Sequence, residues 1–162
     1  MAIRGKTPLQ LAYTAGLFDG EGYISILRIT GTKQLAAKGK RNTWHELTVG
    51  MNITTPEATK WMADRWGGTN ILHPTIYPNR KRIHMWRISQ VMARDFLTDL
   101  LPYLKIKREE AVLAIEFQAL KSFRFGRAGI PEANLKRRDE IWYEMRRRHG
   151  TLDRYGGVAR RD

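Results

Sequence analysis

The residues best suited to chemistry lie in one short stretch near the N-terminus, Thr14–Gly22. Asp19 and Glu21 supply two carboxylates, and the glycines on either side of Glu21 give the backbone freedom and leave that carboxylate unshielded. A carboxylate beside backbone carbonyl oxygens suits a hard cation such as Mg²⁺, which takes oxygen ligands and can complete its shell with phosphate oxygens. The same four residues, Asp-Gly-Glu-Gly, are also typical of an ordinary helix-to-strand turn with a solvated glutamate.

A helix must position these carboxylates, and its start is well marked. Thr7 can act as N-cap, Pro8 suits the first helical position, and Gln10 can close a capping box. The residues that follow are apolar on nearly all sides, which is typical of a helix buried in a core or against a partner. Small residues at Ala15 and Gly16 leave a face that a second helix can approach closely.

The rest of the chain predicts an α+β fold of order αββαββα, with a curved four-stranded antiparallel sheet backed by helices and extra C-terminal helices. We expect Thr55 and Ser89 to cap the second and third helices. One domain is expected over residues 1–150, followed by a frayed basic tail over 151–162. The expected strands are 23–30, 44–54, 69–77 and 82–89, and the further helices are 56–66, 90–101, 107–123 and one beginning at Pro131.

Composition excludes several classes of protein. The chain has 162 residues, a formal net charge of +13, 42% hydrophobic residues and no cysteine, so a disulfide scaffold, a thiolate metal site and a cysteine nucleophile are excluded. No apolar run approaches a membrane span or a signal peptide, so we expect an intracellular protein without a membrane partner. The positive charge predicts a polyanionic partner, with nucleic acid as the leading candidate. The charge is concentrated, because residues 22–94 hold 12 basic and three acidic side chains.

The nonapeptide TAGLFDGEG resembles the LAGLIDADG motif of homing endonucleases. Five positions match that motif, namely Ala15, Gly16, Leu17, Asp19 and Gly22, while Thr14, Phe18, Gly20 and Glu21 replace its Leu, Ile, Ala and Asp. A second segment, Leu101–Arg108, looks like the family's Pro-aromatic-Leu-x-x-Lys segment, which opens the helix after the sheet. The αββαββα order and the length of single-motif members agree with this resemblance, which covers residues 7–125.

The resemblance implies a homing endonuclease: a metal-dependent enzyme that cleaves double-stranded DNA at a long pseudo-palindromic site and leaves short 3′ overhangs. It implies a homodimer, no small-molecule substrate, and an intracellular location wherever the host intron or intein DNA resides. Mg²⁺ is the expected cofactor, with Mn²⁺ or Ca²⁺ able to occupy the site in vitro. An alternative on the same fold is a non-cleaving nucleic-acid binder, such as an RNA maturase or a transcriptional regulator.

The resemblance also assigns roles to individual residues. Glu21 and the carbonyl of Gly20 are expected to hold metal, and Lys107 matches the family's active-site lysine, with Lys105 as a competing assignment. Thr55 stands where many relatives place a water-positioning Gln, and Lys60 could replace a basic residue that relatives carry one turn into the next helix. The motif helices of two copies are expected to pack together, with an interface formed by Thr14, Ala15, Gly16, Phe18 and Asp19.

DNA contacts are expected on one face of the sheet, because side chains alternate along a strand and an antiparallel sheet can lie in the major groove. A basic cluster on the final helix adds candidate phosphate contacts, although each of these charges could equally be solvated surface. The expected DNA-binding residues are Ser25, Leu27, Ile29, Lys33, Lys38, Lys40, Arg41, Glu46, Thr48, Asn52, Arg80, Lys81, Arg82, Arg87, Lys136, Arg137 and Arg138.

Overall fold

The computed structural model describes residues 6–30, 43–73, 78–121 and 129–150. The expectations for Lys33, Lys38, Lys40, Arg41, the side chain of Ile29 and the tail 151–162 lie outside these residues. The elements are α1 (Pro8–Glu21), β1 (Gly22–Thr30), β2 (Thr43–Ile53), α3 (Pro56–Trp66), β3 (Thr69–Leu72), β4 (His84–Ser89), α4 (Gln90–Leu100), α5 (Arg108–Ala119) and α6 (Glu132–Arg148).

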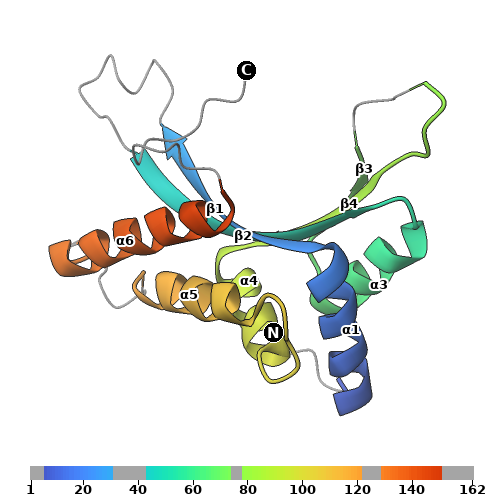
Figure 1. Cartoon of the computed structure of the whole chain (residues 1–162), viewed down its shortest axis with the longest axis horizontal. Coiled ribbons are helices and arrows are strands. Elements are labelled where there is room, and N and C mark those ends of the chain that lie inside the picture. Colours follow the sequence, from blue (N-terminus) through green and yellow to red (C-terminus); the bar gives the residue numbers. More distant parts are fainter. Residues whose placement is uncertain (1–5, 31–42, 74–77, 122–128, 151–162) are drawn as a thin grey trace.

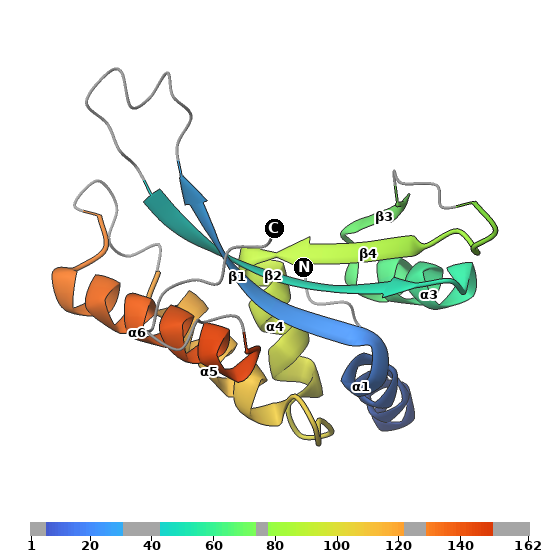
Figure 2. The same ribbon diagram turned by 45° about the horizontal axis from the view of Figure 1, so that its top comes forward.

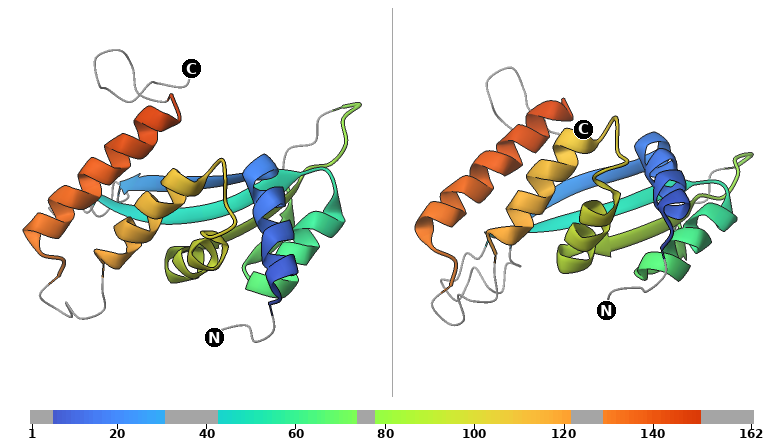
Figure 3. Two further views of the ribbon diagram at one scale, coloured as in Figure 1. Left: turned by 60° about the horizontal axis from the view of Figure 1, so that its bottom comes forward. Right: turned by 90° about the horizontal axis from the view of Figure 1, so that it is seen from below.

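The four strands form one antiparallel sheet in the order β1-β2-β4-β3, and the described helices lie on the same face of it (Figures 1 and 2). Seen from below, all of these helices stand in front of the sheet, with α1 crossing one end and α6 the other (Figure 3). None of the described helices lies on the opposite face (Figures 1 and 2). The predicted α+β class and the αββαββα order with additional C-terminal helices are therefore confirmed.

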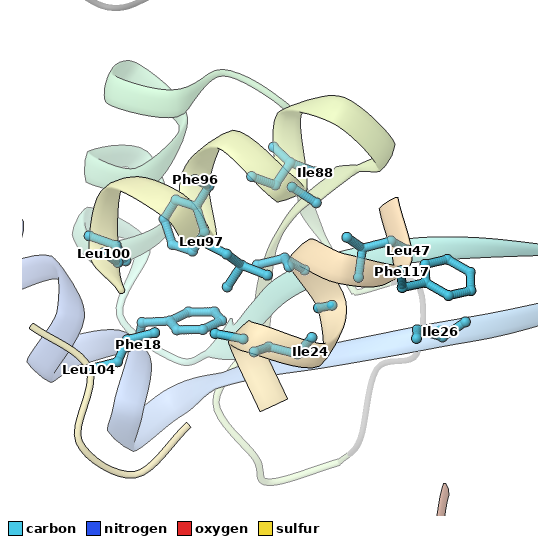
Figure 4. Close-up of a cluster of buried hydrophobic side chains, with 14 of the residues drawn as sticks. Phe18, Ile24, Ile26, Leu47, Ile88, Phe96, Leu97, Leu100, Leu104 and Phe117 are labelled. Atoms are coloured by element: carbon cyan, nitrogen blue, oxygen red, sulfur yellow. The ribbon is translucent and has the colours of Figure 1, made fainter. Parts of the chain in front are cut away.

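The core lies between the sheet and the helices, and strand alternation creates it. Apolar residues at every second position of β1, β2 and β4 point toward the helices and are buried, namely Ile24, Ile26, Leu47, Val49, Met51, Trp86 and Ile88. From the helices, Phe18 and Phe96 pack edge to face with ring centroids 5.1 Å apart, and Phe117 covers the sheet beside Ile26 and Leu47 (Figure 4). This core sets α1 against the sheet and so places its C-terminal end at the start of β1.

The predicted start of α1 is confirmed as a complete capping box: the N–H of Gln10 donates to the Thr7 hydroxyl at 3.3 Å, and the N–H of Thr7 donates to the Gln10 amide oxygen at 3.2 Å. Thr55 and Ser89 precede α3 and α4 as expected, in the N-cap position, but their side chains do not bond to the helix ends. The Ser89 hydroxyl instead lies 3.4 Å from that of Thr48.

The described ends of the last two strands differ from the ends that the sequence pattern predicts. Within the expected strand 69–77, β3 covers Thr69–Leu72 and residues 74–77 lie outside the described residues, while the expected strand 82–89 begins at His84. The backbone N–H of His73 still donates to the Ile83 carbonyl at 2.8 Å, so the two segments stay paired one residue beyond the end of β3. β-Propensity alone does not locate such ends. The residues from Pro78 to Arg82 are exposed, so they have no buried side chains that would stabilise strand pairing there.

Candidate functional site

The two motif carboxylates point to opposite sides of the end of α1. Asp19 is 8% exposed and faces the interior, whereas Glu21 is exposed. Two positions along an α-helix turn the side chain by roughly 200°, so a buried Asp19 forces Glu21 outward. Glu21 makes no hydrogen bond or ion pair with any residue that the structure describes. The exposed carboxylate is therefore free to bind a ligand from solution.

The turn after Glu21 needs glycine at one position and leaves space at another. A Cβ on Gly22 would overlap the Phe18 ring, so only glycine lets the chain leave the helix against that ring. Gly20 has no atom within 4 Å of the place a Cβ would take, and it is exposed. The backbone of Gly20 is consequently accessible beside the Glu21 carboxylate.

Asp19 ties this helix end to the segment before α5. Its carboxylate accepts the backbone N–H groups of Lys105 at 2.8 Å, Ile106 at 3.2 Å and Lys107 at 3.0 Å. Three successive amides that converge on one anion form a concave donor site. Burial raises the pKa of the Asp19 carboxyl, but the three amides and the nearby Lys107 ammonium outweigh it, and the net pKa lies below its ordinary value.

The side chain of Lys107 also bonds to Asp19. Its ammonium donates to the backbone carbonyl oxygen of Asp19, one of the last four carbonyls of α1, which the helix itself leaves without a partner. A cation at this end also suits the helix dipole. The structure thus places the Lys107 ammonium at the helix end that carries Glu21, while the backbone of Lys105, rather than its side chain, forms the contact there.

The roles expected for Thr55 and Lys60 remain predictions. Gly22 pairs with Met51, so the end of β2 lies beside the start of β1, and Thr55 follows four residues later with an exposed side chain. Lys60 is exposed and donates to Asp64 at 2.6 Å. That ion pair directs Lys60 along its own helix.

The expected dimer interface needs a correction. Thr14, Ala15 and Phe18 are fully buried within the chain and Asp19 nearly so, which leaves their side chains no surface to give to a partner. The Thr14 hydroxyl bonds to the Gln10 carbonyl and accepts the indole N–H of Trp61 at 3.3 Å. Ala15 was assigned to the wrong side of the helix, because that side of α1 packs within the chain against α3 and α4.

Gly16 alone of the expected set lies on the exposed side of α1. The same side carries Leu9, 79% exposed, and Tyr13, 59% exposed. Ile106, whose backbone is bonded to Asp19, adds a side chain that is 76% exposed. A Cβ on Gly16 would meet no atom within 4 Å, so nothing in the described structure explains a glycine in mid-helix. We call Leu9, Tyr13, Gly16, Gly20 and Ile106 the exposed α1 surface.

The uncovered face of the sheet carries most of the predicted DNA-binding strand residues. The strand register places Ser25, Leu27, Glu46, Asn52 and Arg87 on it. Thr48 shares this parity but is only 3% exposed, with its hydroxyl beside that of Ser89. The expectation that Thr48 contacts DNA is therefore wrong, since its side chain is enclosed by its neighbours.

Sequence reasoning missed Tyr23, which lies on the same face nearest Glu21. Tyr23 pairs with Gly50, and Gly50 pairs with Arg87, so the three lie in one row across β1, β2 and β4. A Cβ on Gly50 would overlap the Tyr23 hydroxyl, which shows that the ring lies across that glycine. Burial raises the pKa of Tyr23, and the charge of Arg87 opposes this rise. A glycine inside a strand was the available signal.

The basic cluster Lys136–Arg138 belongs to α6, which packs on the side of the sheet opposite the open face (Figure 1). Arg138 is 4% exposed; its guanidinium donates to the carbonyls of Phe117 and His45, and burial lowers its pKa to about 10. Arg137 forms a bidentate pair with Glu116 at 2.6 and 3.0 Å. The expectation for Arg138 is therefore wrong, because its guanidinium is buried, whereas Lys136 and Arg137 are exposed and their DNA contacts remain predictions. Helical periodicity alone does not show on which side of a sheet a helix packs.

Arg80, Lys81 and Arg82 fit their predicted place better. All three are exposed in the connection that precedes β4, at one end of the open face. Among the described residues no group of three or more His, Asp or Glu side chains could hold a metal ion. Within the same residues no helix is long and apolar enough to cross a membrane.

Comparison with solved structures shows that the chain has the fold of LAGLIDADG homing endonucleases. I-CvuI, solved in complex with its target, is 16% identical over 85% of this chain and 80% of its own, with a TM-score of 0.61. The archaeal intron-encoded I-Vdi141I, complexed with DNA, is 12% identical over 86% of this chain and 83% of its own, with a TM-score of 0.63. At these identities the similarity is one of fold. No protein-family model and no curated protein sequence matches the chain.

The similarity differs in extent between neighbours. The I-SmaMI endonuclease bound to cleaved DNA matches 90% of this chain but only 49% of its own length, with 15% identity and a TM-score of 0.56. This chain therefore corresponds to about half of that protein and to most of I-CvuI or I-Vdi141I.

Proposed function

We propose that the protein is a site-specific, metal-dependent endonuclease that cleaves double-stranded DNA as a homodimer. The observation that carries the proposal is the exposed, unpaired Glu21 carboxylate at the border of a sheet face that no described helix covers. A protein that only binds nucleic acid gains nothing from a carboxylate directed at phosphate, since the two repel each other. The similarity of fold to endonucleases complexed with DNA supports the same activity.

The open face supplies what a DNA-reading surface needs. Arg87 is exposed there and forms no ion pair with any described residue, so its guanidinium can bind guanine in the major groove. Asn52 suits adenine and Glu46 suits cytosine by the geometry of their hydrogen bonds. Arg80, Lys81 and Arg82 lie where they can contact backbone phosphates.

The donor set at the end of α1 fits a hard divalent cation. It offers one carboxylate from Glu21 and the accessible carbonyl of Gly20, with open space beside them. Phosphate oxygens of DNA would supply further ligands, which agrees with the lack of a preformed metal cluster among the described residues. Mg²⁺ bound there would neutralise phosphate charge and make water a better nucleophile.

The chain's own residues contribute binding and charge. Glu21 would hold the cation at the helix end through its exposed carboxylate. The Lys107 ammonium, fixed on the Asp19 carbonyl, presents positive charge toward the phosphate undergoing attack and stabilises the added negative charge of the transition state.

A second copy of the chain completes the site, and the exposed α1 surface is its docking surface. Leu9, Tyr13 and Ile106 expose large apolar area around Gly16, where a glycine costs helix stability and is explained by close approach of another helix. A two-fold axis along α1 would bring two Glu21 carboxylates together, one for each DNA strand. The half-length match to I-SmaMI agrees with a unit that works in pairs.

The dimer is tested by replacing Gly16 with alanine and with leucine. Gly16→Ala leaves the isolated chain intact because space is open around it, yet both variants should raise the dimer dissociation constant, leucine more than alanine. Sedimentation of the free protein and of its DNA complex measures this. A wild-type protein that stays monomeric in both states contradicts the shared site.

The activity is tested by cleavage selection on a randomised DNA library with Mg²⁺. We expect recovery of one pseudo-palindromic site with short 3′ overhangs, and loss of cleavage when EDTA replaces Mg²⁺. DNA that is retained but never cut would favour the non-cleaving binder instead. The intracellular location of the host DNA stays a prediction from the sequence.

A further inference from the structure

Asp19 makes four hydrogen bonds to a segment that is 86 to 88 positions away in the sequence. Three run from backbone amides to its carboxylate, and the fourth runs from the Lys107 side chain to its backbone carbonyl. Lys107 is therefore attached to Asp19 twice, once through its amide at 3.0 Å and once through its ammonium. The backbone and the side-chain ammonium of Lys107 are both bonded to one residue of α1.

This contact does more than cap a helix. Residues 101–107 form an irregular connection between α4 and α5, and its last residue precedes α5 as N-cap with no side-chain cap bond. Asp19 accepts the last three backbone N–H groups of that connection, those of Lys105, Ile106 and Lys107. Its carboxylate is buried, so an amide in its place would leave N–H groups unpaired and set its own NH₂ against them.

We propose that Asp19 is the positioning residue of the site: it holds the backbone of Lys105, Ile106 and Lys107 so that the Lys107 ammonium stays at the end of α1 beside Glu21. This rests on the proposed endonuclease activity. Asp19 touches neither metal nor DNA, because its side chain faces the interior while Glu21 faces outward. It acts on the reaction only through Lys107.

A double-mutant cycle tests this, with Asp19→Asn, Lys107→Met and the pair measured on the selected DNA site. Displacement of a catalytic group by about 1 Å costs on the order of 10²-fold in rate, so Asp19→Asn should lower kcat by that order while KM and DNA affinity change less than about threefold. In the Lys107→Met background the same substitution should lower kcat by less than about threefold, because the group that it positions is already gone.

Asp95→Asn is the matched control, since it makes the same carboxylate-to-amide change in an exposed ion pair with Arg94 on α4. Asp95→Asn should leave kcat unchanged, both in the wild type and in the Lys107→Met background. Thermal unfolding is measured for every variant, and Asp19→Glu, which keeps the charge but shifts the carboxylate by one methylene, serves if Asp19→Asn is unfolded at the assay temperature. Asp19→Glu should also lose kcat with DNA affinity retained.

The outcomes separate the two proposals. A wild-type protein that cuts no DNA refutes the proposed function. A wild type that cuts, with equal losses from the Asp19 substitution in both backgrounds, refutes the positioning role and leaves a structural one. Unchanged kcat in Asp19→Asn or in Lys107→Met also overturns it.

Discussion

The hydroxyl of Tyr23 lies over the α-carbon of Gly50, so a single added methyl group there would overlap it. The two residues are cross-strand partners on the open face, and Gly50 in turn pairs with Arg87. Because Gly50 has no side chain, the Tyr23 ring can lie across it, in the row of residues Tyr23, Gly50 and Arg87 close to Glu21.

Gly50→Ala should lower the free energy of unfolding by about 1–3 kcal/mol, the range for overpacking, because the new Cβ also lies 2.7 Å from the Trp86 carbonyl oxygen. Specific DNA affinity should fall as Tyr23 is displaced. Chemical denaturation and DNA titration measure both. Adding Tyr23→Ala to Gly50→Ala should recover part of the lost stability but none of the lost DNA affinity. If the effects of the two substitutions on the free energy of unfolding simply add, the contact between Tyr23 and Gly50 is contradicted.

Arg138→Ala should destabilise the fold by about 3 kcal/mol without changing DNA affinity per folded molecule, because the guanidinium is buried and pairs with the carbonyls of Phe117 and His45. Arg138→Lys should recover only part, since an ammonium cannot span both carbonyls in the same fork geometry. Urea unfolding provides the measurement. A large loss of DNA affinity at unchanged stability would instead show that Arg138 contacts DNA.

Specific DNA binding should weaken on the order of 10³-fold between 50 and 200 mM salt, as expected for a surface with several phosphate contacts. Arg87→Ala should weaken binding at every salt concentration because it removes an open-face cation. Arg137→Ala is the control: this residue carries the same charge but lies on the helix side in a bidentate pair with Glu116. If the two substitutions weaken binding equally, DNA does not lie on the open face.

The net lowering of the Asp19 pKa makes its contribution to stability depend on pH in a definite direction. A carboxyl whose pKa is lower in the folded state stabilises the fold above its unfolded pKa, about 3.9, and loses this contribution as pH falls through the folded value. The stability difference between wild type and Asp19→Asn should therefore be constant from pH 7 to 5 and shrink below pH 4. A difference that persists unchanged to pH 2 would contradict the ionised network.

The fold was predictable to a large extent because its signals are local. Alternation in β1 identified Ile24 and Ile26 as core, and the Thr7–Gln10 capping box was visible as a four-residue pattern. The exposed position of Glu21 also follows from the helix period once one carboxylate is known to be buried.

What could not be predicted depends on distant partners. Nothing near Asp19 in the sequence indicates that its carboxylate accepts hydrogen bonds from backbone amides 86 to 88 positions away. Asp19 was therefore assigned to the dimer interface. The cluster at Arg137 and Arg138 looks like a phosphate-binding surface until the packing of α6 against β1 and α5 is known. Tyr23 was missed because its place is set by a glycine on another strand.

Cleavage of the selected site by wild type and by Glu21→Gln, with DNA affinity measured in parallel, tests the central claim most directly. The substitution keeps the size of an exposed side chain and removes its charge, so the fold and DNA binding should be retained. We expect loss of detectable cleavage in Mg²⁺ at unchanged occupancy of the site. Cleavage by Glu21→Gln at the wild-type rate, or loss of cleavage only in proportion to lost binding, would contradict the role of Glu21.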